Sequence, residues 1–340
     1  MKQVSEAFVP GDRASELIPL MKSKGYVDLS ARITSVDGGK LVPVLPGFEK
    51  EMAELGLAMS TGPAYSEASR PPMERIRERL PDFPADLVER LPDKWEIAGS
   101  VITVKMDPEL FQYGEILGKV YAEVLGAESI LADVSGVSGE FREPDMRLLY
   151  GEIGESVKLE NGIRYCFDVT KVMFASGNLV ERKRMGSQDC TGETVVDMFA
   201  GIGYFTLPLA KFSNARKVFA CEKNPNSYAF LVKNIALNGL TNVIPLLGDN
   251  RAIAGGHFAD RILMGYVQTT SEFVPKALEL AKPGCLIHYH DTFPVGKEYA
   301  MTQEIFDRYC GNGKYEIVGM REVKSFAPSV SHYVADIRVF

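Results

Sequence analysis

The clearest hydrophobic pattern in the chain is a pair of short apolar runs, residues 194–199 and 217–221. The first run has the length and the β-branched content of a buried strand, and Ala200-Gly201-Ile202-Gly203 follows it at once. The second run ends at Glu222. This pattern predicts two strands with a tight glycine turn after the first, where backbone N–H groups at the start of a helix can face a ligand.

Glu222 indicates which class of ligand that turn binds. It lies nineteen positions after Gly203, at the predicted tip of the second strand, where a carboxylate can accept both hydroxyls of a ribose. Thr206 stands where a dinucleotide-binding fingerprint has its third glycine. The pattern therefore favours S-adenosylmethionine, which has a ribose but no phosphate. The alternative is that Gly201 and Gly203 form an ordinary strand-to-helix turn.

Apolar and polar positions continue to alternate in helix-length and strand-length segments after Glu222. The predicted strands are 242–247, 260–266 and 285–290, the predicted helices are 226–238, 272–281 and 297–310, and a closing hairpin spans 315–324 and 332–339. Parallel strands with crossover helices and a terminal hairpin predict an α/β fold with a doubly wound sheet and one antiparallel strand.

The segments before residue 164 are shorter and predict smaller α+β domains. We expect a small N-terminal α+β domain, a helical linker, a second small α+β domain and the ligand-binding domain, over residues 1–60, 61–93, 94–163 and 164–340 respectively. Within them, Pro43 predicts an edge strand because proline cannot donate to a sheet. Residues 95–104 predict one strand, and the glycine-containing segment 135–147 predicts a loop.

Composition narrows the class of protein. The 340 residues include 46% hydrophobic ones, but no window of eighteen apolar residues predicts a membrane span, and the N-terminus has no signal core. Five scattered cysteines predict free thiols in a reducing compartment, which favours the cytoplasm. Because the net charge is −7, any binding to nucleic acid has to rely on a local basic patch.

Two basic segments are candidates for such a patch. Residues 164–184 contain five basic and two acidic side chains, and Arg142 and Arg147 lie in the predicted loop 135–147. A basic stretch directly before the ligand-binding strand can hold a phosphate-bearing substrate. The alternatives are the solvated face of an amphipathic helix for the first segment and surface ion pairs for the second.

Polar residues at the predicted strand ends leave further alternatives open. Asp249 and Asn250 follow the third strand, where they can accept from an adenine amine or simply form a turn. His288 and His290 share one face of a predicted strand, but no third and fourth ligand follows at a suitable spacing. We therefore predict a polar cluster at these histidines and no metal site.

Several motifs together resemble a known family. Asp197–Phe205, Glu222–Pro225 and Gly248-Asp249 resemble motifs of class I S-adenosylmethionine-dependent transferases. The segments 174–182, 139–147 and 323–328 are similar to the archaeal and eukaryotic group that contains the tRNA guanine-37 N1-methyltransferase and the wybutosine-synthesis aminocarboxypropyltransferase. This resemblance covers roughly residues 95–340. Residues 1–50 more loosely resemble the N-terminal tRNA-binding domain of the methyltransferase branch.

Two departures favour the aminocarboxypropyltransferase branch. The methyltransferase has Asn-Leu-Pro or Asn-Pro-Pro after its fourth strand, where this chain has Leu263-Met264-Gly265-Tyr266. It also tends to have Pro-Arg where this chain has Gly177-Asn178. The resemblance thus implies transfer of the 3-amino-3-carboxypropyl group of S-adenosylmethionine to carbon 7 of 4-demethylwyosine at position 37 of tRNA(Phe), leaving methylthioadenosine.

The pattern and the resemblance together assign site residues. The expected S-adenosylmethionine-binding residues are Ala175, Ser176, Arg182, Phe199, Ala200, Gly201, Gly203, Glu222, Lys223, Asp249 and Asn250. The resemblance implies that Asn178 and Arg182 position the methionine portion, with Arg182 at its carboxylate. The expected contacts to tRNA phosphates are Arg142, Arg147, Lys171, Lys183, Arg184 and Lys324.

These residues leave three other functions open. The first is N1-methylation of guanosine 37 or methylation of a wyosine-type base. The second is a tRNA-binding module without turnover, and the third is a small-molecule methyltransferase.

Overall fold

The computed structural model describes residues 3–28, 31–63, 71–139, 142–174, 176–267 and 269–340. The chain divides after Glu89 into two compact units, Met1–Glu89 and Arg90–Phe340, each of which is described by itself. The four-part division expected from the sequence stays a prediction.

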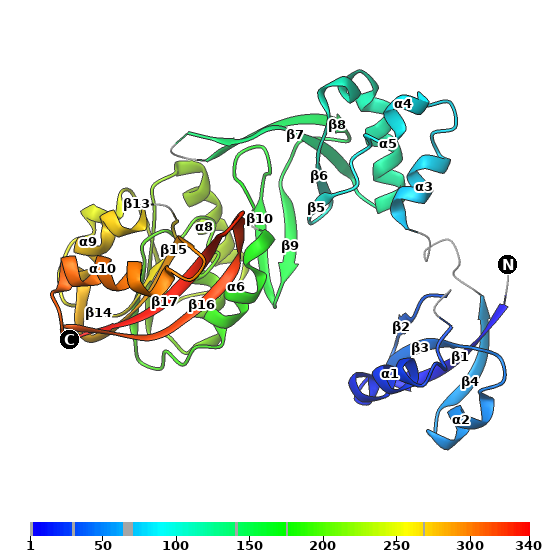
Figure 1. Ribbon diagram of the computed structural model, residues 1–340, viewed down its shortest axis with the longest axis horizontal. Helices are drawn as coiled ribbons and strands as arrows, with labels where there is room; N and C mark the ends of the chain where they lie inside the picture. The colour runs from blue at the N-terminus through cyan, green and yellow to red at the C-terminus, as the bar shows by residue number, and fades with distance from the viewer. Residues whose placement is uncertain (1–2, 29–30, 64–70, 140–141, 175, 268) are drawn as a thin grey trace. The chain divides into compact units, whose positions relative to one another are not determined.

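The N-terminal unit contains a four-stranded antiparallel sheet with the order β2-β3-β1-β4 (Figure 1). Its strands are β1 (Gln3–Pro10), β2 (Thr34–Val36), β3 (Gly39–Val44) and β4 (Ala58–Pro63), and its helices are α1 (Ala14–Ser23), α2 (Glu49–Glu54), α3 (Pro72–Glu78) and α4 (Ala85–Val88). One hydrophobic core joins the sheet to α1 and α2 through Val9, Met21, Val42 and Met52.

Pro43 lies in a strand, β3, but the prediction that this strand is at the edge of its sheet is wrong. β3 is an interior strand that pairs with β1 on one side and with β2 on the other. β2 pairs only with Gly39–Leu41, so it ends before Pro43. The missing N–H of Pro43 therefore removes no bond to β2, which is why an interior strand tolerates it here.

The C-terminal unit begins with a second four-stranded sheet, with the order β5-β6-β7-β8. Its elements are β5 (Trp95–Ala98), β6 (Val101–Lys105), the 3₁₀ helix η1 (Pro108–Tyr113), α5 (Gly114–Leu125), β7 (Ser129–Ser138) and β8 (Glu143–Tyr150). A single strand over 95–104 is a wrong prediction. Gly99 adopts a positive φ of 68° and turns the chain back into a hairpin, and a Cβ at this position would collide with the hydroxyl of Ser156.

The loop predicted over 135–147 is also largely a hairpin. β7 and β8 pair from Ile130 to Ser138, with an irregularity between Asp133 and Val137. Figure 1 shows β7 and β8 as a long two-stranded extension of the sheet. A two-stranded sheet, β9 (Ser156–Glu160) with β10 (Ile163–Phe167), follows it in the chain.

A seven-stranded sheet forms the main body of this unit, with the order β13-β12-β11-β14-β15-β17-β16. Its strands are β11 (Thr194–Asp197), β12 (Lys217–Glu222), β13 (Val243–Leu247), β14 (Ala259–Met264), β15 (Ala281–Pro294), β16 (Tyr315–Ala327) and β17 (Val330–Val339). The first five are parallel, and β17 runs antiparallel to both of its neighbours. The predicted doubly wound sheet with one antiparallel strand is confirmed.

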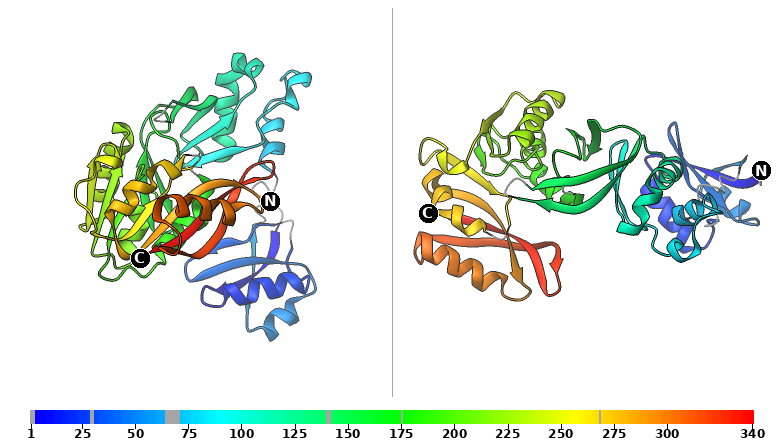
Figure 2. Two further views of the ribbon diagram at one scale, coloured as in Figure 1. Left: turned by 60° about the vertical axis from the view of Figure 1, so that its left-hand side comes forward. Right: turned by 90° about the horizontal axis from the view of Figure 1, so that it is seen from above.

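Helices cover both faces of this sheet because successive strand residues point in opposite directions. The helical elements are η2 (Ser176–Asn178), α6 (Leu179–Gly186), α7 (Thr206–Phe212), α8 (Pro225–Leu237), η3 (Asn250–Ala252), η4 (Thr270–Phe273), α9 (Val274–Leu280) and α10 (Glu298–Cys310). Val195 packs with residues of α6, α7 and α8, whereas Val196 packs with residues of α9 and α10. Figure 2 shows α10 beside the β16–β17 hairpin at the end of the sheet.

Candidate functional site

The turn after β11 is organised by a buried carboxylate. Asp197 accepts hydrogen bonds from the backbone N–H of Phe199 at 3.1 Å and from the hydroxyl of Thr206 at 2.7 Å. Burial raises the pKa of Asp197 to about 6. Gly203 has a φ of 102°, and a Cβ there would lie 2.5 Å from Cγ of Leu207. Glycine is therefore required in this turn, which brings the backbone of residues 199–203 to the edge of a cavity.

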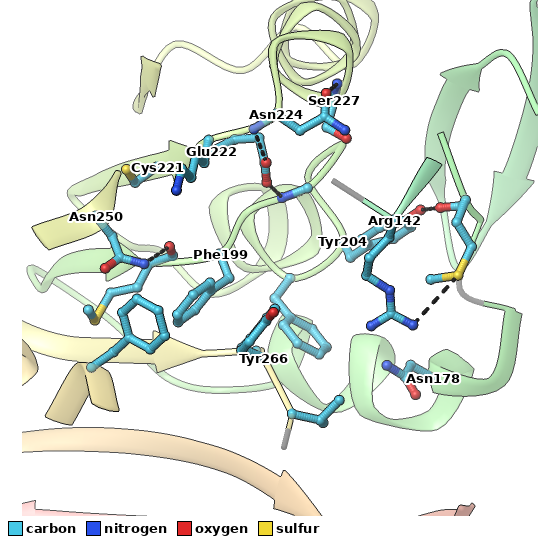
Figure 3. A pocket seen from close by; sticks show the side chains of 18 of the residues that line it. Arg142, Asn178, Phe199, Tyr204, Cys221, Glu222, Asn224, Ser227, Asn250 and Tyr266 are labelled. Carbon is cyan, nitrogen blue, oxygen red and sulfur yellow. Dashed lines mark hydrogen bonds between the residues drawn. The ribbon is translucent and has the colours of Figure 1, made fainter. Parts of the chain in front are cut away.

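Glu222 ends β12 directly beside this turn. One carboxylate oxygen accepts from the N–H of Gly201 and the other from the N–H of Asn224, each at 2.7 Å (Figure 3). Burial raises the pKa of Glu222, while these N–H groups lower it. Because each oxygen has a second lone pair, the carboxylate can still accept from two adjacent hydroxyls of a ligand.

The cavity at this edge has a volume of about 320 Å³ and is formed by the C-terminal unit alone. Of the residues expected to bind S-adenosylmethionine, the structure brings six to the cavity wall: Phe199, Gly201, Glu222, Lys223, Asp249 and Asn250. Ala200 and Gly203 belong to the turn but are not among the described lining residues. Ala175 lies outside the described residues, as does the side chain of Ser176.

Aromatic rings line the end of the cavity near η3. Phe199 stacks on Tyr266, with ring centroids 5.0 Å apart, and contacts Phe273 edge-on at 4.9 Å. Their faces offer an apolar surface for a flat heterocycle. The sequence does not assign Tyr266 or Phe273 to the site, because they lie at the end of a predicted strand and at the start of a predicted helix, where aromatic residues are typical of a core.

The two polar residues at this end have different roles. Asp249 accepts from the N–H of Arg251 and binds its guanidinium at 2.6 and 2.9 Å, an arrangement that lowers the pKa of Asp249. The Asn250 amide donates to the carbonyl of Met198 at 2.9 Å. Asp249 thus forms the turn that was the alternative interpretation, and its contact to adenine stays a prediction.

The opposite end of the cavity is cationic. Arg142 and Lys324 both line it, together with Asn178, and Figure 3 shows Arg142 and Asn178 on the side away from Glu222 and Asn250. Burial and the nearby charge of Arg142 lower the pKa of Lys324. Oδ1 of Asn178 is buried and has no hydrogen-bond partner among the described residues. This end of the cavity therefore suits an anionic or hydrogen-bonding group of a ligand.

Arg182 does not lie at this cationic end. Its side chain is 1% exposed, and its guanidinium binds both carboxylate oxygens of Glu160, at 2.5 and 2.9 Å. It also lies over the rings of Phe174 and Tyr204. The expected role of Arg182 at the carboxylate of the methionine portion is therefore not supported, because Glu160 occupies the fork that such a carboxylate would need.

The six residues expected at tRNA phosphates fall into two groups. Lys171, Lys183 and Arg147 lie on the surface, with Lys171 beside Asp168 at 3.5 Å and Arg147 over the ring of Phe111. Arg142 and Lys324 line the cavity instead.

Arg184 is the sixth of these residues, and it belongs to a network within the fold. Its guanidinium binds Glu181 at 2.6 Å and Asp336 at 3.2 Å, and its side chain is 15% exposed. Nδ1–H of His288 donates to the same Asp336 at 2.6 Å. This network explains Arg184 as a structural residue, so a phosphate contact by Arg184 is not supported.

Metal-type side-chain clusters and membrane-length helices are two further features with a bearing on function in the described part of the chain. No group of three or more His, Cys, Asp or Glu side chains among these residues has the arrangement of a metal site. Within the same residues, no helix combines the length and the apolar character needed to cross a bilayer.

Comparisons with known proteins agree with the geometry of the cavity. The TRM5/TYW2 methyltransferase domain matches residues 156–318, and the TYW2 N-terminal domain matches residues 76–154. The tRNA(Phe) (4-demethylwyosine(37)-C(7)) aminocarboxypropyltransferase of Pyrococcus horikoshii is 45% identical over 270 residues, which cover 78% of this chain and 96% of that protein.

A solved structure and a methyltransferase are also similar over most of the chain. The crystal structure of P. horikoshii TYW2 in complex with MeSAdo has a TM-score of 0.70 at 43% identity, covering 79% of this chain and 99% of that one. The tRNA (guanine(37)-N(1))-methyltransferase Trm5b of Pyrococcus abyssi is 34% identical over 322 residues, covering 93% of each chain.

Proposed function

Because the chain belongs to the TRM5/TYW2 family, as its motifs suggest, we propose that it is a tRNA aminocarboxypropyltransferase. It transfers the 3-amino-3-carboxypropyl group of S-adenosylmethionine to carbon 7 of 4-demethylwyosine at position 37 of tRNA(Phe), and methylthioadenosine (MeSAdo) remains. The observation that carries this proposal is one cavity that has Glu222, a carboxylate able to accept from ribose hydroxyls, at one end and the cations Arg142 and Lys324 at the other.

The donor substrate S-adenosylmethionine fits the residues that line this cavity. Glu222 accepts from the two ribose hydroxyls, and the rings of Phe199 and Tyr266 lie where they can contact the adenine. Lys223, Asp249 and Asn250 are the further contacts at this end.

The amino-acid arm of the donor has its partners at the cationic end. Its carboxylate lies near Arg142 and Lys324, which replace Arg182 in this role, and Asn178 offers a buried acceptor to its ammonium group. A sulfonium activates each of its three carbons, so the carbon that reacts is the one held about 3–3.5 Å from the nucleophile. Fixing the arm by its carboxylate therefore makes the arm, and not the methyl group, the group that is transferred.

The segment after β14 also favours arm transfer over N1-methylation. Gly265 stands near the position where the methyltransferase motif has an asparagine and a proline. A Cβ at Gly265 would lie 2.8 Å from Cε2 of Phe205, whose ring stacks on His290. The aromatic ring thus fills the space that an amide side chain would need.

N1-methylation of guanosine 37 is a second candidate, favoured by the N-terminal unit. The similarity to Trm5b extends over 93% of the chain, whereas the P. horikoshii aminocarboxypropyltransferase covers 78%. The extra similarity supports a shared N-terminal domain, and its binding to tRNA stays a prediction. Similarity in this domain concerns how the tRNA is bound and does not distinguish which carbon of the donor is transferred.

The state of the tRNA substrate distinguishes the two candidates. We would incubate the protein with S-adenosylmethionine and tRNA(Phe) that carries either 4-demethylwyosine or guanosine at position 37, and identify the nucleosides by mass spectrometry. We expect a product that gains the arm from the first tRNA only, with an equal amount of MeSAdo. N1-methylguanosine in the second tRNA would support the second candidate instead.

The cationic end is tested by comparing two ligands that differ only in the arm. Lys324→Met is expected to weaken the binding of S-adenosylmethionine about tenfold or more, which is the range for a hydrogen bond to a charged group, and to leave the affinity for MeSAdo unchanged. Calorimetry measures both. Lys314→Met removes the same charge from an exposed position and is the control. Equal losses for both ligands would place the arm elsewhere.

A further inference from the structure

Two buried histidines on neighbouring strands connect the cavity to the interior of the sheet. His332 on β17 lines the cavity, and its Nε2 lies 3.0 Å from Nδ1 of His290 on β15. The side chains are 4% and 1% exposed. Two imidazoles at this distance are joined by one hydrogen bond, in which one ring donates and the other accepts. The direction of this hydrogen bond decides which nitrogen of His332 is left as an acceptor.

The charge behind His290 sets this direction. Nε2 of His290 has no hydrogen-bond partner among the described residues, but it lies 3.8 Å from Oε1 of Glu181. The guanidinium of Arg184 binds the carboxylate of Glu181 at 2.6 Å. A negative charge here favours hydrogen on Nε2 of His290, whose Nδ1 then accepts from Nε2–H of His332. This tautomer leaves Nδ1 of His332 with a lone pair.

The surroundings of His332 keep it neutral. Lys324 lies opposite it on β16, and His290 contacts it from β15. Burial and the charge of Lys324 lower the pKa of His332 to about 4, and His288, Arg184 and Asp336 are the further charged or titratable groups around His290. His332 is thus an uncharged proton acceptor in the wall of the cavity, on the side of the cationic end.

We propose that His332 is the catalytic base that removes the hydrogen from carbon 7 of the nucleobase, an inference that rests on the proposed function. Carbon 7 forms a bond to the terminal methylene of the arm, and the methylene–sulfur bond breaks with its electron pair moving to sulfur, giving neutral MeSAdo. The ring is then cationic and still carries the hydrogen. Nδ1 of His332 takes this proton, and the C–H electron pair restores the ring.

A weak base is sufficient for this step because the cationic ring is a strong acid. The imidazolium that forms on His332 donates through Nε2–H to Nδ1 of His290, and Nε2 of His290 faces the carboxylate of Glu181 at 3.8 Å. His290 and Glu181 are therefore positioning residues that orient His332 and stabilise its charged form. In many enzymes a catalytic base is oriented in this way by a second hydrogen-bonding group.

His332→Gln tests the assignment, because glutamine keeps a donor near the position of Nε2 but has no basic nitrogen. With tRNA(Phe) carrying 4-demethylwyosine, we expect kcat for MeSAdo release to fall about 100-fold while the Kd for S-adenosylmethionine is unchanged. Deuterium at carbon 7 is expected to slow the variant by a primary isotope effect, since proton loss becomes rate-limiting. The exposed His257 provides the control, His257→Gln.

The isotope effect separates a catalytic role from a structural one. A variant that is merely misfolded also loses MeSAdo affinity and its remaining turnover shows no new isotope effect, which would contradict the assignment. Unchanged kcat in His332→Gln would contradict it too. If the wild-type protein forms no MeSAdo from this tRNA, the proposed function itself fails, which is a separate result. Should His332→Gln not fold, His290→Asn is expected to show the same isotope effect with a smaller loss.

Discussion

At the scale of single residues, Glu222 carries the ribose end of the site. Its two oxygens are fixed by the N–H groups of Gly201 and Asn224, so the carboxylate needs no rearrangement to accept two hydroxyls. An amide at this position would direct its NH₂ group at one of these N–H donors. The charge and both acceptors are therefore required together.

We predict that Glu222→Gln weakens the binding of both S-adenosylmethionine and MeSAdo by about 10- to 100-fold, which is the range for hydrogen bonds to a charged group. Equilibrium dialysis with each ligand measures the change. Glu298→Gln is the matched control, because Glu298 also accepts a loop N–H, from Gly296, at a half-buried position outside the cavity. A loss restricted to S-adenosylmethionine would place Glu222 at the arm.

How far single residues could be predicted from the sequence depends on how local their partners are. Glu222 was predictable because its spacing from Gly203 is a property of one strand–helix–strand unit. The buried partner of Arg182, Glu160, lies 22 positions away, and Asp336, which binds Arg184 together with the local Glu181, lies 152 positions away. The sequence alone does not show that such acids are brought to them by the fold.

At the scale of elements, Arg182 and Glu160 join α6 to β9. Both side chains are buried, so removing one partner leaves a charge without compensation. This gives the pair a structural role that can be separated from ligand binding.

We predict that Arg182→Met lowers the free energy of unfolding by about 3–5 kcal/mol, and that Glu160→Met in the same chain recovers most of this loss. Urea unfolding measures both. Arg308→Met breaks an exposed pair with Glu304 and is expected to cost at most about 1 kcal/mol. If the folded Arg182→Met protein lost S-adenosylmethionine affinity and kept its stability, the ligand role first expected for Arg182 would return.

The elements themselves were predictable where a periodic pattern was long or had a clear boundary. The seven-stranded sheet satisfied this condition from β11 to β17. The β7–β8 hairpin did not, because its glycines and charges between 135 and 147 are typical of a loop. β1 was missed although Ala7 and Val9 are buried in it, because polar and proline residues interrupt the run.

At the scale of the whole molecule, the net charge of −7 requires tRNA to be bound by local cations. Lys171 and Lys183 are exposed and lie in the basic segment before β11. Each contact between a lysine and a phosphate releases counterions, so it contributes to the salt dependence of binding.

We predict that replacing Lys171 and Lys183 by alanine weakens tRNA binding and lowers the slope of log affinity against log salt concentration by about one to two. Filter binding over a range of salt concentrations measures the slope. Lys217 and Lys314 are exposed lysines outside this segment, and their double replacement by alanine is the control. Equal slopes in both double variants would remove the basic segment from the tRNA interface.

The carbon of the donor that is transferred defines the reaction of this enzyme. The most direct measurement is a single incubation with tRNA(Phe) carrying 4-demethylwyosine and S-adenosylmethionine labelled with ³H in the methyl group and ¹⁴C in the carboxyl group. We predict that the tRNA gains ¹⁴C alone and that ³H appears in MeSAdo. Incorporation of ³H into the tRNA, with ¹⁴C left in S-adenosylhomocysteine, would contradict the account.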